Sequence, residues 1–251
     1  MHLRVDEERP RLSLSPPQLI IDGQPGKRYR ATFLVRNLTP DQFPLVLGAI
    51  DLQAGDSPTS LVRPRTGASR DVATWMQLPQ PRRMTAASGE QLSVPVIISI
   101  PPNASPGLHA GAFVVSRRLS EPAAATDQKS RITVQGNLAA EIFIRVAGDA
   151  TTSFRLRVEH APRWVHHGDR PVYSALLTNT GDTLLQASGK LALGTFAGTD
   201  AGSYRLSPRS TLVLPDGARR MEARWDDPPF LGWFKPTIFA DVNGAPQQLD
   251  I

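Results

Sequence analysis

The alternation of apolar and polar residues along the chain is the clearest structural signal in the sequence. In residues 28–36 the apolar side chains fall on every second position, with Leu34 as the exception. Residues 91–100 and 131–146 show the same period of two. Because successive side chains of a β-strand point to opposite faces, this period predicts half-buried strands. The longest run, 131–146, contains Gly136, where we expect a bulge or a bend.

The second half of the chain has the same pattern in shorter segments. Apolar residues alternate with charged ones over 154–159 and 220–225, and turns rich in Gly, Pro and Asn follow at short intervals. Helix patterns are weak, and we expect residues 119–130 to form a flexible hairpin loop. Many short strands with such turns predict an all-β fold of antiparallel sandwiches.

An imperfect internal repeat divides this fold into two similar parts. Residues 27–39 resemble residues 169–180, because each segment is a strand closed by an Asn-containing turn. The length of 251 residues also suits two domains of roughly 100–150 residues each. The sequence therefore predicts two tandem antiparallel Ig-like β-sandwich domains, at residues 10–147 and 149–251, joined near residues 148–152.

Composition and charge exclude several classes of protein. The chain has no Cys, which excludes disulfides, thiolate metal sites and cysteine nucleophiles. Its longest mainly apolar stretch, residues 94–100, is far shorter than the ~20 residues that a membrane helix needs. The N-terminal residues 1–10 lack the apolar region of a signal peptide, which predicts a cytoplasmic, a mature or a trimmed chain. The formal net charge of +5 arises wholly before residue 149.

Several motifs in their order along the chain carry a family resemblance. In the first half these are LSPPQL at 14–19, GKRYRATFLVRN at 26–37, WMQL at 75–78, GEQLSVPV at 89–96 and IPPNASPGLHAG at 100–111. In the second half they are LTNTGD at 177–182, LVLPDGAR at 212–219 and FLGWF at 230–234. This succession resembles bacterial cell-surface proteins of the WxL-interacting type over roughly residues 11–245.

The resemblance implies an exported cell-envelope protein with two Ig-like domains. In that family the first domain is linked to peptidoglycan binding and the second to contacts with a partner or host. Members also carry a signal peptide and a membrane anchor, so the implication assumes that both were removed from this chain.

Catalytic, cofactor and metal signatures are missing from the sequence. It contains no GxSxG, no phosphate-binding loop and no GxGxxG, and we therefore expect a protein that is not an enzyme and has no cofactor. We expect its five histidines to be solvated loop residues, because none has the spacing of a zinc site. Asp226 and Asp227 precede two prolines, which favours a turn over acid–base chemistry.

Two groups of residues are candidates for binding. The basic group could contact an anionic polymer, and it comprises Arg63, Arg65, Arg70, Arg82 and Arg83. The aromatic group, Trp164 and Phe230, lies in expected loops, whereas we expect Trp75 and Trp225 to fill sandwich cores. Both groups also have a simpler interpretation as ordinary solvated surface. Nucleic acid is a poor partner, because aromatic residues are not interleaved with these arginines.

The functional prediction is a non-enzymatic, extracytoplasmic binding or adhesion protein. Its expected partner is a cell-wall polymer or a surface protein, bound through sandwich faces and loops. The alternative is a periplasmic, pilus-chaperone-like assembly protein that lends a strand to the exposed edge of a subunit. A third possibility is an accessory domain of an enzyme whose catalytic module lies elsewhere on a longer gene.

Overall fold

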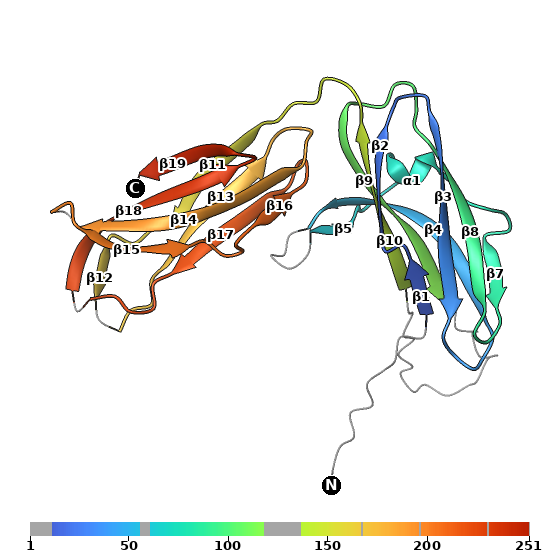
Figure 1. Ribbon diagram of the computed structural model, residues 1–251, viewed down its shortest axis with the longest axis horizontal. Helices are drawn as coiled ribbons and strands as arrows, with labels where there is room; N and C mark the ends of the chain where they lie inside the picture. The colour runs from blue at the N-terminus through green and yellow to red at the C-terminus, as the bar shows by residue number, and fades with distance from the viewer. Residues whose placement is uncertain are drawn as a thin grey trace, which may run out of the picture. The chain divides into compact units, whose positions relative to one another are not determined.

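The computed structural model of the protein describes residues 12–55, 61–117, 137–166, 168–195, 197–229 and 231–250. These residues form two compact units (Figure 1). The first unit runs to residue 52 and continues over 64–105 and 109–147, and the second comprises 53–63, 106–108 and the chain from 148 onward. The expected loop at 119–130 and the candidate Phe230 lie outside the described residues.

The first unit contains two sheets. One has four strands in the order β1 (Leu12–Ser15), β3 (Arg28–Asn37), β8 (Gln91–Ser99) and β6 (Met76–Gln77). The other has the order β2 (Gln18–Gly23), β10 (Asn137–Val146), β9 (Gly107–Arg117), β4 (Phe43–Ala54) and β5 (Val62–Pro64), and β7 (Arg83–Ala86) also pairs with β4. A single turn of helix, α1 (Val72–Trp75), precedes β6.

The inner faces of these two sheets form the first core. Alternate residues of β3 and β8 are buried, as the period of two predicts, and Leu34 remains partly exposed on the outer face. Phe33 on β3 stacks on Phe113 of β9 with ring centroids 4.8 Å apart, which joins the two sheets at the centre of the core.

The second unit has the same two-sheet design. Its smaller sheet has the order β11 (Phe154–His160), β13 (Val172–Asn179) and β17 (Ala218–Arg224). Its larger sheet has the order β12 (Trp164–His166), β18 (Leu231–Val242), β14 (Leu185–Thr195) and β15 (Asp200–Arg205). Two further strands join that sheet, β16 (Thr211–Val213) on β14 and β19 (Ala245–Asp250) on β18. A separate core lies between the sheets, with Trp225 packed edge-on against Phe234 at 4.8 Å.

The predicted fold class, all-β with two Ig-like sandwiches, is confirmed. The sheets are mainly antiparallel, and one pair of strands is parallel, since β2 runs parallel to β10. The reason is that the chain changes sheets between β1 and β2. Pro16 and Pro17 lie at this change, where prolines cannot donate ladder hydrogen bonds, so β1 pairs with β3 while β2 joins β10.

Candidate functional site: an open sheet edge

The edge formed by β2 is the most distinctive binding feature of the first unit. β2 is the end strand of its sheet, and it pairs with β10 in parallel with Ile20 beside Phe143. Glu141 N donates to Pro17 O at 2.9 Å, and Ala147 N donates to Gly23 O at 2.8 Å. These two bonds fix the phase of the ladder, since residues of a paired strand direct their backbone groups alternately to either side.

Given this phase, the odd-numbered residues of β2 direct their backbone N–H and C=O groups to β10, and the even-numbered residues direct theirs to the opposite side. Gln18, Ile20 and Asp22 thus direct their N–H and C=O groups to the open edge. Within the described residues no other strand pairs with this side of β2. Such a row of unpaired donors and acceptors is a template for strand addition.

The first residues of β10 extend this edge. β2 pairs with β10 only from Glu141 onward, so no strand in the described part of the chain pairs with Asn137 and Ala139 on that side. The same phase directs the backbone groups of both residues to that open side. The unpaired edge therefore continues past the start of β2.

The side chains along this edge combine an apolar centre with polar ends, Gln18 and Asp22. Ile20 is 55% exposed although it lies in the middle of a strand. At one end an Arg145 Nε to Asp22 Oδ1 ion pair of 2.7 Å lies on the surface, where such a pair contributes little to stability. An exposed edge with a large apolar side chain is a liability unless another chain covers it. This arrangement suits recognition of a second polypeptide through its backbone.

The predicted basic group is not one patch. Arg65 N bonds to Asp51 O, whereas Arg82 O accepts from Leu47 N, so the two arginines flank positions four residues apart on β4. That separation is roughly 13 Å along the strand. Arg70 N also bonds to Asp51, Arg63 lies on β5, which pairs with β4, and Arg83 follows the second position, all at exposed positions. The five arginines, although close in the sequence, therefore form two groups in the structure. Their role in binding stays a prediction.

The predicted aromatic site, Trp164 and Phe230, gains a second tryptophan, Trp233. Trp164 on β12 is 42% exposed and stands opposite Trp233 of β18, which is 56% exposed. Their ring centroids are 5.2 Å apart. Trp75 and Trp225 are buried. The alternation over β18 places Trp233 on the outer face, opposite buried Phe234, and this signal could have identified it.

His109 corrects the expectation that the histidines are solvated loop residues. It lies in β9 with its side chain 13% exposed, and its ring packs on Trp75. Its Nδ1 is 2.8 Å from Asp71 Oδ1, and its Nε2 is 2.8 Å from the backbone O of Ser105. Burial lowers the pKa of His109, but the hydrogen bonds to Asp71 and Ser105 and the Asp71 charge outweigh it and raise the pKa overall.

This Ser–His–Asp grouping is a structural clamp and does not have the geometry of a nucleophilic triad. The Ser105 Oγ is 3.5 Å from His109 Nε2, while the Ser105 carbonyl holds the same nitrogen at the shorter distance. A ring nitrogen that donates to a carbonyl cannot accept the serine proton.

The described residues contain no group of three His, Cys, Asp or Glu side chains that could hold a metal ion. In the same part of the chain, no helix has the length and apolar character needed to cross a membrane.

Comparisons with known proteins place the fold. No protein-family model and no curated protein matches the sequence. A chain from a solved chaperone–tip adhesin complex of CFA/I fimbriae matches with a TM-score of 0.50 at 9% identity, covering 95% of this chain and 97% of that one. The class 5 fimbriae chaperone CfaA matches at 10% identity and a TM-score of 0.48, covering 95% and 98% of the two chains. A CsuC–CsuE chaperone–tip adhesion subunit complex of Acinetobacter baumannii matches at 10% identity and a TM-score of 0.46, covering 96% and 97%.

The comparisons contradict the main functional prediction, a cell-envelope adhesion protein that binds wall polymer. The two-unit fold extends over nearly the whole of a chain from a fimbrial chaperone complex, the class that was the alternative. The prediction of peptidoglycan binding by the first domain is not supported either. The error has a simple origin, because strand–turn patterns recur among Ig-like domains, pilus chaperones included. The resemblance to WxL-interacting proteins itself stays an untested prediction.

Proposed function

We propose that this protein is a non-enzymatic assembly chaperone that binds a partner subunit by β-strand pairing at the edge formed by β2 and the start of β10. The observation that carries the proposal is the open edge with exposed Ile20 at its centre. A subunit with an exposed sheet edge gains main-chain hydrogen bonds from such pairing, and side chains on either face supply specificity.

The fold comparison supports the same proposal. The match to a chain of a chaperone–tip adhesin complex covers both units, as expected for a two-domain chaperone. Under this proposal the protein acts outside the cytoplasm, in the periplasm, where its partner is a surface-fibre subunit. The edge would cover the subunit until that subunit meets its next neighbour.

A proline at the edge separates strand pairing from folding. In Ile20→Pro, the N–H that is lost faces the open edge, so the β2–β10 ladder keeps its hydrogen bonds. Ile20→Val is the matched control, because it keeps both the N–H and an apolar side chain. Circular dichroism and tryptophan fluorescence check that each variant folds as the wild type does.

The experiment begins with a photoreactive side chain at position 20 of the full chain in its own cells, and at Leu212 on β16 as a control. We expect position 20 alone to give an adduct with another polypeptide, identified by mass spectrometry. That polypeptide should be insoluble when expressed alone, soluble with the wild type or Ile20→Val, and insoluble with Ile20→Pro. Unchanged solubility with the folded Ile20→Pro variant, or no adduct at position 20, would overturn the proposal.

A further inference from the structure

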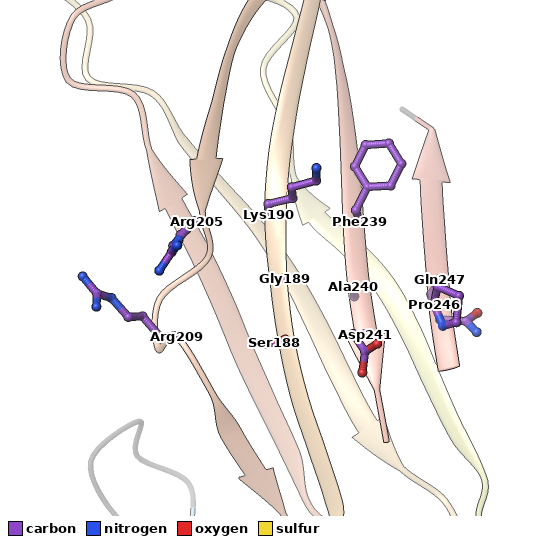
Figure 2. A pocket seen from close by; sticks show the side chains of 10 residues that line it. All are labelled: Ser188, Gly189, Lys190, Arg205, Arg209, Phe239, Ala240, Asp241, Pro246 and Gln247. Carbon is purple, nitrogen blue, oxygen red and sulfur yellow. The ribbon is translucent and has the colours of Figure 1, made fainter. Parts of the chain in front are cut away.

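A groove on the outer face of the larger sheet of the second unit has the features of a separate binding site (Figure 2). Its volume is about 440 Å³, within the usual range for ligand sites. Gly189 on β14 and Ala240 on β18 lie at its centre, with Arg205 and Arg209 on one side and Gln247 of β19 on the other (Figure 2).

The groove concentrates positive charge that the protein itself leaves unbalanced. Lys190 of β14 stands directly opposite Arg205 of β15, and Arg209 follows in the turn after β15. Like charges in directly opposed positions destabilise a sheet. Within the described residues, none of these three side chains forms an ion pair or a hydrogen bond. Asp241 is the one acidic residue among those described that line the groove, and its carboxylate accepts a hydrogen bond from Gly244 N at 2.8 Å.

The remaining lining identifies the kind of ligand. Phe239 and Pro246 offer apolar surface, and the Lys190 Nζ lies 5.4 Å from the centroid of the Phe239 ring. A bare inorganic anion would use the three cations and leave these apolar groups without a role. A peptide with acidic side chains uses both, since guanidinium groups bind carboxylates in two-pronged pairs while the apolar surface packs against neighbouring side chains.

We propose that this groove binds an acidic segment of a partner polypeptide, with carboxylates held by Lys190, Arg205 and Arg209. The site is a side-chain site on the second unit, so it is independent of the strand pairing proposed for the first unit. Binding relieves the repulsion between Lys190 and Arg205, which supplies a driving force that a neutral peptide lacks. Charge contact at an open groove also makes the affinity fall as salt increases.

The probe for this site is a fluorescein-labelled octapeptide of alternating Glu and Leu, with the Gln–Leu peptide as its neutral counterpart. Fluorescence anisotropy with the full chain measures the dissociation constants. The groove variant carries Lys190→Gln, Arg205→Gln and Arg209→Gln. The matched control carries Arg155→Gln, Arg170→Gln and Arg224→Gln, exposed positions of the same unit outside the groove, with the same loss of charge.

We expect the Glu–Leu peptide to bind the wild type, and the groove variant to lose at least about tenfold in affinity, since several charge-assisted hydrogen bonds disappear. The control variant should change by less than about twofold, as expected for a screened surface charge. Ile20→Pro should leave this binding unchanged, so the site can fail or succeed separately from the proposed chaperone edge.

Three results would overturn the proposal. Equal losses of affinity for the Glu–Leu peptide in the groove and control variants would show that the affinity depends only on the net charge of the protein. Equal affinities for the neutral and acidic peptides would show that Lys190, Arg205 and Arg209 do not bind the carboxylates. Displacement of the peptide from the wild type by millimolar inorganic phosphate, at constant ionic strength, would make the groove a general anion site.

Discussion

A buried asparagine closes the same turn in each unit of the protein. Asn37, at the end of β3, has no exposed surface, and its Oδ1 accepts from Thr39 N at 2.9 Å. Its amide nitrogen donates to three backbone carbonyl groups at 2.7 to 3.2 Å, those of Asp41, Ala86 and Ala87. Asn179, at the end of β13, accepts from Gly181 N and donates to two carbonyl groups, those of Thr183 and Val213. One amide thus replaces the ladder where each strand ends.

Asn37→Ala should lower the free energy of unfolding by about 2–4 kcal/mol, because buried carbonyl groups lose their donor. Asn37→Asp should be no better, since a carboxylate would face the same carbonyl oxygens. Urea unfolding followed by circular dichroism measures the change. Asn103→Ala, at an exposed turn, is the control and should cost under ~0.5 kcal/mol. A loss below 1 kcal/mol in Asn37→Ala would contradict the role given to this amide.

The hydroxyl group of Tyr173 lies in the second core without a stabilising interaction among the described residues. The side chain is fully buried, and its Oη has no hydrogen-bond partner among the described residues. Burial, together with Tyr204 nearby, raises the pKa of Tyr173 to about 12. Tyr173→Phe should therefore raise the free energy of unfolding by about 1 kcal/mol, since an unsatisfied group is removed. Destabilisation on urea unfolding would show that the hydroxyl is bonded after all.

His109 makes the stability of the first unit depend on pH. Its pKa is raised in the folded state by the hydrogen bonds to Asp71 and Ser105, which outweigh the opposing effect of burial. The stabilisation is thus complete below the unfolded pKa of about 6.5 and is lost as pH rises through the higher folded value. We expect the wild type to lose stability from pH 5.5 to 8.5 by thermal unfolding.

His109→Phe keeps a ring against Trp75 and removes the titration, so it is the matched control for this pH effect. Its unfolding temperature should change less than that of the wild type over the same range. Parallel curves for the two proteins would assign the pH dependence to other groups.

At the scale of elements, the sequence pattern predicts the strands that have one buried face and one face exposed to solvent. The alternation over β3, β8 and β17 matches their burial residue by residue, because solvent on one side imposes the period of two. The sequence of β2 does not alternate in this way. Leu19, Ile20 and Ile21 form a continuous apolar run, and their partners on β10 lie more than a hundred residues along the chain. Nothing local specifies that parallel pairing.

The candidate sites were harder to predict for the same reason. Arg65 and Arg82 lie 17 residues apart in the sequence and attach to separate positions along β4, whereas Lys190 and Arg205, 15 residues apart, stand opposite each other because β14 and β15 are paired. A charge cluster read along the chain assumes that neighbours in sequence are neighbours in space. In a sheet that assumption fails, since cross-strand partners decide which side chains meet.

Helix α1 depends on a glycine in the strand beneath it. A Cβ added to Gly111 of β9 would lie 2.7 Å from Val72 Cβ, too close for the helix to keep its place. Gly111→Ala should therefore cost about 1–3 kcal/mol on chemical unfolding, as overpacked cores do. Gly48→Ala on β4 is the control, because its nearest heavy atom is 3.9 Å away. Equal stability of the two variants would mean that α1 shifts freely.

At the scale of the molecule, the chain builds two cores that share no residue. The cluster around Phe33 lies between the sheets of the first unit, and the cluster around Trp225 lies between those of the second. Each core is closed by sheets of its own unit, so a cavity in one leaves the packing of the other intact. The expected consequence is two cooperative folding units, each with its own stability.

Phe33→Ala tests this separation. The ring is fully buried and stacked on Phe113, so its removal should destabilise the first unit by about 3–5 kcal/mol through lost burial and a cavity. Hydrogen exchange read by mass spectrometry should show faster exchange in β3, β8 and β9. Exchange in β13 and β14 should match the wild type, with Leu191→Ala as the reciprocal variant for the second core. Faster exchange in both units from either substitution would mean that the two cores unfold as one.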